Sequence, residues 1–290
     1  MTAPPIPGGR IRSTAVRHPI ATFLVLAYVL TVAVVLLPVP EVVGGPLENI
    51  VGVAVPAFVV TAAVAGREGV RNLLRRCLRW RIPVHWYAVA LTPALSLLVL
   101  APLLYGQDAL AVLVDNWPRL FTSFLPTFAV MLVLNTLPEE AGATGFLFAR
   151  LQDRHGALRA ALLTTLFFWL WHVPGLVRDS RTLAELGGLL ALYLVGHLAL
   201  RFIVGWLYNA TGTSILIGAI FHATFNSTVN PTGLGVAVLD LPQGDVLVIV
   251  TGLVVLCAVM ITLVTRRRLG YKPQRVRNLD TLAAGDEQRA

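Results

Sequence analysis

The chain has 290 residues, of which 56% are hydrophobic and only 13% are charged. Soluble domains carry about 25% charged residues, so the composition excludes an ordinary soluble domain and indicates an all-α, polytopic transmembrane bundle. The net charge of +8 would suit a nucleic-acid partner, but the basic residues are distributed as in a membrane protein, which argues against one.

About eight apolar segments are candidate spans, because a span needs roughly 20 apolar residues. In chain order they are 20–37, 50–66, 85–104, 120–148, 158–175, 186–204, 213–229 and 246–265. No other stretch is long enough to fold alone, so we expect one bundle over residues 18–268. Residues 1–17 and 269–290 are expected to be cytoplasmic tails.

The first apolar segment could be a signal peptide, because Arg10, Arg12 and Arg17 precede it. Its core is long for a signal, and no small-x-small cleavage site follows in the sequence PVPEVVGG. We therefore interpret 20–37 as a true span.

The basic residues are asymmetric along the chain. With eight spans and an inside N-terminus, every Lys and Arg except Arg119, Arg178 and Arg181 falls on the inner side. This is the positive-inside pattern and predicts a multi-pass protein of the cell membrane with both termini in the cytoplasm. The basic segment 67–81 is either a solvated loop that fixes this topology or a surface that lies on anionic lipid.

Several ionisable residues lie within the apolar segments, where each costs roughly 2.5–3.5 kcal/mol or more at mid-depth. They are Glu139, Glu140, His172, His197 and His222. Counted along each helix from its inner end, Glu139, His172 and His222 lie roughly 16, 20 and 14 Å deep. Three helices therefore place an acid and two imidazoles near one level of the membrane.

The chemistry of these residues is complementary. A buried Glu can act as a general base toward a water that a nearby His shares, and a second His with an Asn amide can stabilise an oxyanion. Asn226 follows His222 by four residues and so shares its helix face. Adjacent helical residues point about 100° apart, so only one of Glu139 and Glu140 can serve this point. His197 is interpreted as a structural core residue.

Three stretches resemble the motifs of the CPBP intramembrane proteases. They are EEAGATGFLFARLQ at 139–152, FFWLWHVPG at 167–175 and WLYNATGTSILIGAIFHATFN at 206–226. This family includes the CAAX prenyl endopeptidases and the bacterial Abi, or bacteriocin-immunity, proteins. Its motifs are two Glu followed by three residues and an Arg, Phe followed by three residues and a His, and His followed by three residues and an Asn.

The resemblance implies a membrane endopeptidase that acts on a peptide or membrane-protein substrate. It assigns water activation to Glu139 and His172 and oxyanion stabilisation to His222 and Asn226. Glu140 and Phe168 match the family as supporting residues. The Ala, Val and Arg usage suggests a bacterium with GC-rich DNA, so we expect a natural substrate other than a prenylated eukaryotic-style CAAX protein.

A metal is the alternative to direct water activation. Glu139, His172 and His222 come from three helices and could hold a divalent ion such as zinc. The H-E-x-x-H spacing is absent, and the Asn of the third motif is a poor zinc ligand. We favour direct water activation and leave the metal open.

Thr144 stands where the first motif has its Arg, so Glu140 lacks the cation of the family pattern. Arg150 is too far along the same helix to replace it, whereas Arg201 or His197 could do so from another helix. The alternative to an active endopeptidase is therefore a silent member that acts as an immunity factor or scaffold. A proton-coupled transporter is disfavoured, because no inverted repeat is visible and His222 with Asn226 would have no role.

Overall fold

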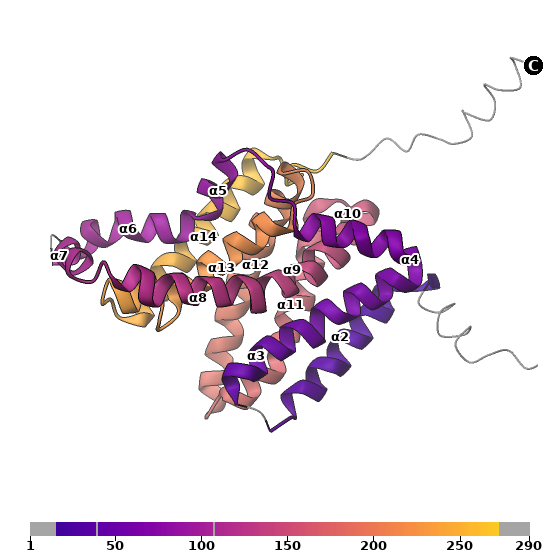
Figure 1. Ribbon diagram of the computed structural model, residues 1–290, viewed down its shortest axis with the longest axis horizontal. Coiled ribbons are helices and arrows are strands. Elements are labelled where there is room, and N and C mark those ends of the chain that lie inside the picture. The colour runs from indigo at the N-terminus through magenta and orange to yellow at the C-terminus, as the bar shows by residue number, and fades with distance from the viewer. Residues whose placement is uncertain (1–15, 39, 107, 273–290) are drawn as a thin grey trace, which may run out of the picture.

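The computed structural model describes residues 16–38, 40–106 and 108–272, and it is an all-α bundle with no strand in these ranges (Figure 1). The chain is a multi-pass membrane protein, as the composition predicts. The α-helices are α2 (Pro19–Val35), α3 (Glu41–Asn49), α4 (Val55–Cys77), α5 (His85–Ala90), α6 (Thr92–Tyr105), α7 (Asp108–Asp115), α8 (Leu125–Val130), α9 (Leu137–Gly142), α10 (Ala149–His155), α11 (Ala157–Asp179), α12 (Leu183–Ala210), α13 (Ile215–Val229) and α14 (Gln243–Val264).

Five π-helical turns join or extend these helices. They are η1 (Ile50–Ala54), η2 (Leu120–Phe124), η3 (Met131–Thr136), η4 (Ala143–Phe148) and η5 (Leu234–Val238). Three of them lie in the continuous helical segment Leu120–His155, and two of these flank α9, the turn that carries the Glu pair. Such turns are rare and occur often at functional sites. Pro138 is the second residue of α9 but lies inside this continuous segment, where its missing N–H removes one backbone hydrogen bond of the helix.

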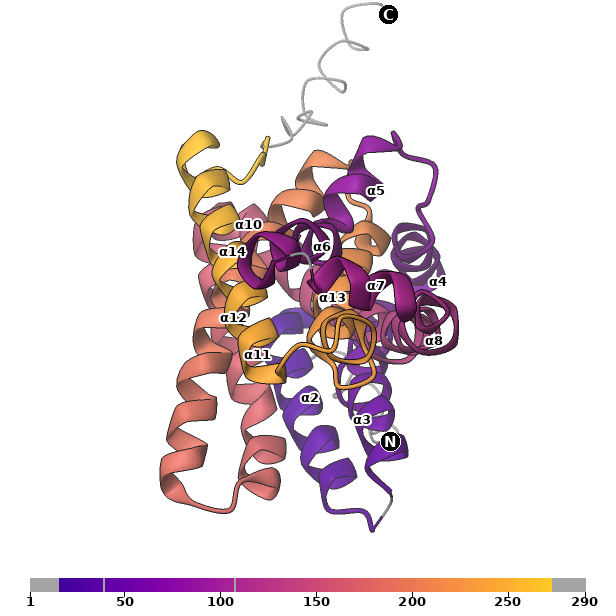
Figure 2. The same cartoon turned by 90° about the vertical axis from the view of Figure 1, so that its left-hand side faces the viewer.

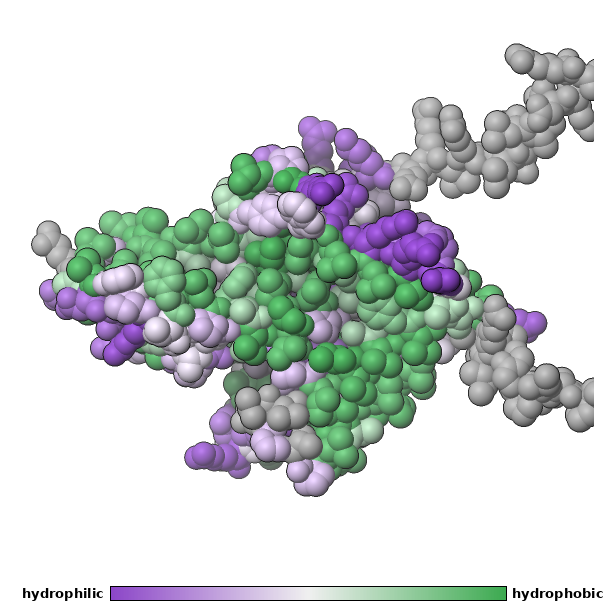
Figure 3. Space-filling view, in the orientation of Figure 1, coloured by the Kyte–Doolittle hydropathy of each residue, from purple (hydrophilic) through white to green (hydrophobic). Residues whose placement is uncertain are grey.

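Each of the eight expected spans overlaps an apolar helix of the structure. Among the described residues, five helices are long and apolar enough to cross a membrane, namely Gly45–Cys77, Leu120–His155, Ala157–Asp179, Leu183–Ala210 and Gln243–Val264. Three shorter apolar helices, α2, α6 and α13, account for the other segments. Apolar side chains cover much of the face in Figure 3, and hydrophilic residues gather at its edges. This arrangement suits contact with lipid.

Helix α4 changes direction sharply at Gly66, where the backbone leaves the helical region with φ +60° and ψ −157° (Figure 1). This left-handed φ favours glycine, because a side chain there would crowd the backbone. Residues 67–77 therefore form a separate helical arm, with Leu73 and Cys77 buried and its charged residues on the outer face. The basic segment is thus helical along most of its length.

One end of the bundle gathers basic residues from distant parts of the sequence. Arg76 donates to the Tyr208 hydroxyl at 2.7 Å, and Tyr271 donates to Asp153 at 2.9 Å. Residues 75–81, 150–159, 208–214 and 266–272 meet here, and we call this the basic end. Leu269 is fully buried here, so the bundle continues past the boundary expected at residue 268. Residues 1–15 and 273–290 lie outside the described chain.

The opposite end holds the C-termini of α11 and α13 and the N-termini of α12 and α14, as Figure 2 shows for α11 and α12. Arg178 pairs with Glu48 there at 3.1 Å, and the Gln243 side chain lies 3.5 Å from the Val229 carbonyl oxygen. We call this the far end. The site lies between the two ends.

Two glycines allow the turn with the Glu pair to pack closely against its neighbours. A Cβ at Gly142 would lie 2.8 Å from the Val53 carbonyl oxygen, and one at Gly145 would lie 2.5 Å from the Ile215 side chain. The backbone at Gly142 therefore lies close to η1, and the backbone at Gly145 lies close to α13. This close approach brings the carboxylates within reach of side chains from α12 and α13.

Candidate functional site

Glu139 and Glu140 are both buried in the bundle, with 5% and 0% of their surface exposed. They lie in α9 and, being adjacent, address different neighbours. Glu140 is surrounded by donors from its own and two other helices, whereas Glu139 faces a cavity. The sequence predicts this division of roles, and the structure adds the partners.

Glu140 is held by Arg201, which lies in α12 and is only 2% exposed. Arg201 Nη1 donates to Glu140 Oε2 at 2.9 Å, and Nη2 donates to Oε1 in a two-point ion pair. The Thr144 hydroxyl donates to the same Oε2 at 2.5 Å. The cation missing from position 144 is therefore supplied by another helix, one of the two residues that the sequence left open.

The position of Arg201 corrects the inner-side charge count of the sequence analysis. That count placed Arg201 at the inner surface, but its guanidinium is inside the bundle and ion-paired. Its charge is neutralised by Glu140, so it carries no topological signal. The remaining basic residues still separate the two ends of the bundle.

Glu139 projects into the cavity with little to bind it. Its Oε2 is buried, lies 3.6 Å from His222 Nδ1 and has no hydrogen-bond partner among the described residues. Buried carboxylate oxygens are nearly always hydrogen-bonded, so an orphaned one needs an explanation such as an unseen water or a substrate group. Glu139 is the acid available for chemistry.

His222 links the two acids from α13. Its Nδ1 lies 2.9 Å from Glu140 Oε1, and because that carboxylate only accepts, Nδ1 is the donor. Asn226 lies one turn further along α13 and faces the same cavity. The Ser214 side chain caps the start of α13 through the Ile217 N–H, which fixes where the helix begins.

His172 reaches the cavity from α11. Its Nδ1 lies 2.7 Å from the Phe168 carbonyl oxygen, which can only accept. The proton is therefore on Nδ1 and the lone pair is on Nε2. Glu139, His172, His222 and Asn226, which the sequence selects from three helices, all line this one cavity.

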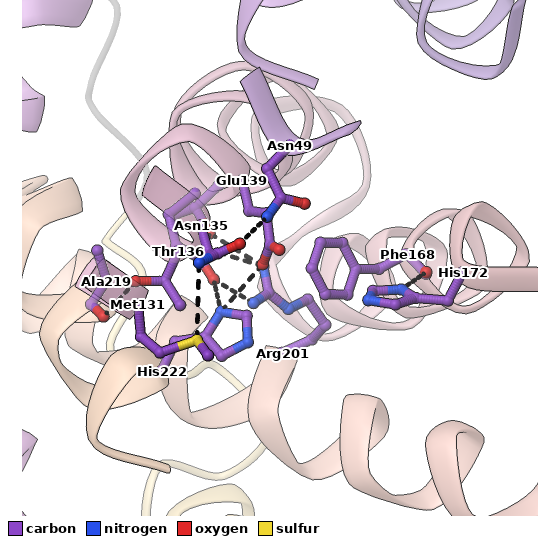
Figure 4. Close-up of polar contacts among 12 residues, drawn as sticks. Asn49, Met131, Asn135, Thr136, Glu139, Phe168, His172, Arg201, Ala219 and His222 are labelled. Carbon is purple, nitrogen blue, oxygen red and sulfur yellow. Dashed lines mark hydrogen bonds and ion pairs between the residues drawn. The ribbon is translucent and has the colours of Figure 1, made fainter. Parts of the chain in front are cut away.

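Phe168 packs at the centre of the site, as the close-up in Figure 4 shows. Its ring centroid lies 4.8 Å from that of His172 and 6.0 Å from that of His222. The Arg201 guanidinium carbon lies 4.5 Å above the same ring. One fully buried aromatic ring thus separates the two imidazoles and stacks on the cation that holds Glu140.

The cavity has a volume of about 390 Å³ and lies between α12, α13 and α14. Its buried floor includes Glu139, His222 and Leu200, and its exposed lining residues are Pro231 and Gln243. These two belong to the far end of the bundle. The cavity therefore reaches the surface at the far end.

His197 lies in the cavity wall, in contrast to the core role expected from the sequence. Its ring centroid is 4.5 Å from that of His172, and its buried Nδ1 has no hydrogen-bond partner among the described residues. A satisfied core histidine would have both ring nitrogens accounted for. The sequence signal was present, because His197 and Arg201 are ionisable residues four apart within one apolar helix.

The side chains around the cavity do not form a metal site of the usual kind. Across residues 16–38, 40–106 and 108–272, no three His, Cys, Asp or Glu side chains lie close enough together to ligate one ion. Glu140 is committed to Arg201, and His222 Nδ1 is committed to Glu140. The atoms that would ligate an ion, Glu139 Oε2 and the Nε2 atoms of His172 and His222, are not committed in this way, so the metal stays the open alternative of the sequence analysis.

A buried Glu pair, two imidazoles and an Asn around a cavity inside a helical bundle define a polytopic membrane protein with a polar centre. Comparison with known proteins shows what this centre is similar to. Residues 121–228, which contain all three motifs, match the family described as type II CAAX prenyl endopeptidase Rce1-like. The chain is also 26% identical over 190 residues to CAAX prenyl protease 2 of Methanococcus maripaludis.

This alignment covers 64% of the present chain and 66% of the relative, a little under two thirds of the relative's length. Together with the motifs, the two matches confirm the resemblance that the sequence shows. Over the part that carries the three motifs, the chain is therefore similar to the CPBP, or CAAX protease, family.

Proposed function

We propose that the protein is a CAAX-protease-type membrane endopeptidase in which Glu139 is the general base. The observation that carries the proposal is the buried, unpartnered Glu139 Oε2 in a cavity shared with His172, His222 and Asn226. The family match supports the reaction class. A carboxylate without a protein donor is free to accept a proton from water.

The reaction begins with a water bound between Glu139 and His172. Glu139 takes a proton from this water, and the water oxygen attacks the carbonyl carbon of the scissile peptide bond. The resulting tetrahedral intermediate carries negative charge on the former carbonyl oxygen. Asn226 donates a hydrogen bond to that oxygen, and so does the Nε2–H of a doubly protonated His222, whose Nδ1–H is held by Glu140. The proton held by Glu139 then passes to the leaving amine nitrogen as the C–N bond breaks.

The hydrogen bonds around the imidazoles prepare them for these roles. The Nδ1–H of His172 donates to the Phe168 carbonyl oxygen, so Nε2 is unprotonated and can accept a hydrogen bond from the water. His222 is held by Glu140, which itself is held by Arg201 and Thr144. Such supporting hydrogen bonds keep the reacting groups in position. The proposed reaction uses no metal.

Arg201 also bears on the alternative of a silent family member acting as an immunity factor or scaffold. That alternative rests on Thr144 leaving Glu140 without a cation, and Arg201 supplies one. No observation in the described part of the chain favours the silent role. We therefore propose the active enzyme.

Cleavage of defined peptides tests the proposal. The full-length protein in lipid is given a fluorogenic peptide library that includes prenylated CAAX peptides, with Glu139→Gln as a matched control. We expect the wild type to cleave at least one class and the variant to cleave none while melting like the wild type. Equal cleavage by the two proteins overturns the assignment of Glu139. No cleavage by a folded wild type supports the silent alternative.

A further inference from the structure

We propose that an arginine pocket at the basic end binds the phosphate of an anionic phospholipid headgroup. The pocket lies where the helical arm 67–77 ends and has a volume of about 670 Å³. It is separate from the cavity with Glu139. Its lining residues are Asn72, Arg75, Arg76, Leu78, Arg79, Trp80, Arg81 and Thr213.

The first guanidinium of the pocket, that of Arg76, is fixed in place. Its Nη1 donates to the Tyr208 hydroxyl of α12 at 2.7 Å, while its Nε is buried and has no partner among the described residues. An unpartnered buried donor costs free energy unless a ligand or water accepts from it. Arg76 also lines the pocket, where a phosphate oxygen is a suitable acceptor for its guanidinium, because charge-assisted hydrogen bonds to guanidinium are strong.

The second guanidinium, that of Arg79, lies over the turn between α12 and α13. A Cβ placed on Gly212 would be only 3.2 Å from Arg79 Nη2, so the side chain lies close against this turn. The Arg79 carbonyl oxygen accepts from the Ser214 hydroxyl at 2.8 Å, which fixes the backbone as well. The two arginines thus reach the pocket from a chain that is already anchored.

The charge of the pocket is largely uncompensated. Of the described residues that line it, none is Asp or Glu. Arg75 shares Glu68 with Arg71 at the rim, with a nitrogen–oxygen distance of 3.4 Å. Arg76, Arg79 and Arg81 form no ion pair within the described ranges. Three guanidinium groups without an ion-pair partner thus line one pocket, which favours an anion with several acceptor oxygens.

The apolar residues of the pocket favour a lipid over free phosphate. Leu78 and Trp80 are 64% and 60% exposed beside the arginines, and the Arg81 guanidinium lies 5.1 Å from the Trp80 ring centroid. Tryptophan and arginine are typical of the membrane–water interface, where the ring meets acyl chains and the cation meets headgroups. The helical arm packs its apolar face on the protein core through Leu73 and Cys77, which leaves its charged outer face toward the headgroups.

Binding titrations in neutral detergent test the proposal on the full-length protein, without any need for protease activity. The probes are short-chain phosphatidylglycerol, phosphatidylcholine and inorganic phosphate. The test variant is Arg79→Gln/Arg81→Gln, which keeps the Arg76–Tyr208 contact. The matched control is Arg266→Gln/Arg268→Gln, which removes the same charge from the same end outside the pocket.

We expect phosphatidylglycerol to bind the wild type and to raise its melting temperature. The pocket variant should bind it about tenfold or more weakly, since charged hydrogen bonds are lost, while the control variant changes little. If both variants lose the same affinity for phosphatidylglycerol, binding depends on the overall positive charge of this end, and the proposal of a specific pocket is wrong. Equal binding of phosphatidylcholine overturns the anionic preference. If inorganic phosphate binds as tightly as phosphatidylglycerol, the claim that the pocket prefers a lipid to free phosphate is wrong.

Discussion

His222 Nδ1 lies 2.9 Å from Glu140 Oε1 and 3.6 Å from Glu139 Oε2, so a single imidazole on α13 lies against two adjacent acids. The two acids are nevertheless unequal. Glu140 has three protein donors and Glu139 Oε2 has none among the described residues. The adjacent pair therefore divides into one anchoring carboxylate and one that is free to react.

Glu139→Gln should reduce cleavage at least about 100-fold, because a general base contributes roughly that much or more. Stability should change little, since Glu139 Oε2 makes no hydrogen bond that the substitution removes. The measurement is the cleavage rate in one lipid, with thermal melting of the same sample. A variant that retains wild-type rates would show that another group accepts the proton.

Glu140→Gln and Arg201→Met should each destabilise the protein by about 3–5 kcal/mol, because each leaves a buried charge without its partner. The double variant should lose less than the sum of the two, which a double-mutant cycle of melting measurements can establish. Additive losses would show that the pair is not energetically coupled.

Relocating the cation is a sharper test of the same ion pair. Thr144→Arg alone should destabilise the protein, because the Thr144 hydroxyl is 3.5 Å from Arg201 Nη1 and a second buried guanidinium would lie beside the first. Thr144→Arg/Arg201→Leu should recover much of that loss by restoring the family's motif. Recovery is measured as melting temperature and, for the active enzyme, as cleavage rate.

His197→Phe should raise the KM for a cleaved peptide about three- to tenfold and change kcat little. The reason is that His197 lines the cavity with an unpartnered nitrogen, and one neutral hydrogen bond is worth about 0.5–1.5 kcal/mol. Phenylalanine keeps the ring packing against His172 and Phe168. Steady-state kinetics at several peptide concentrations separates the two constants. An unchanged KM would show that His197 does not contact the peptide and is a structural residue, as the sequence analysis expects.

Gly66→Ala should destabilise the bundle by about 1–2 kcal/mol, because the residue has a left-handed φ that L-amino acids pay to adopt. A steric clash with neighbouring residues is not the cause of this loss, since a Cβ at Gly66 would have no atom within 4 Å. Gly187→Ala in α12 is the matched control, because it too has open space but no positive φ. Thermal melting should show a loss in the first variant and none in the second.

Impermeant maleimide should label Gln243→Cys in intact cells and Arg79→Cys only after the membrane is opened. The reason is that the basic end should face the cytoplasm. The far end, where Gln243 lines the mouth of the cavity, should then face the outside of the cell. A background without Cys77 and Cys257 removes the native thiols. The reverse labelling pattern would contradict the predicted orientation of both termini.

The sequence predicted the all-α bundle and the family because both depend on local signals. Apolar runs mark the helices, and the spacing of Glu139, His172 and His222 from their helix ends indicates a common depth. Whether their assignment as reacting groups holds stays a prediction. The partnership of Glu140 with Arg201 could not be predicted, because it depends on how α9 and α12 rotate about their axes. Two π-helical turns beside α9 change that rotation.

The separation of Glu140 and Arg201 along the chain also affects how the protein enters the membrane. An arginine at position 144 would accompany Glu140 in the same helix, whereas Arg201 follows 61 residues later. The segment Leu120–His155 is therefore synthesised before its counter-charge exists, and an unpaired carboxylate in the bilayer costs roughly 2.5–3.5 kcal/mol or more. Glu140 therefore gains its counter-charge only after α12 has been synthesised, so two helices that are not adjacent in the sequence complete the polar centre together.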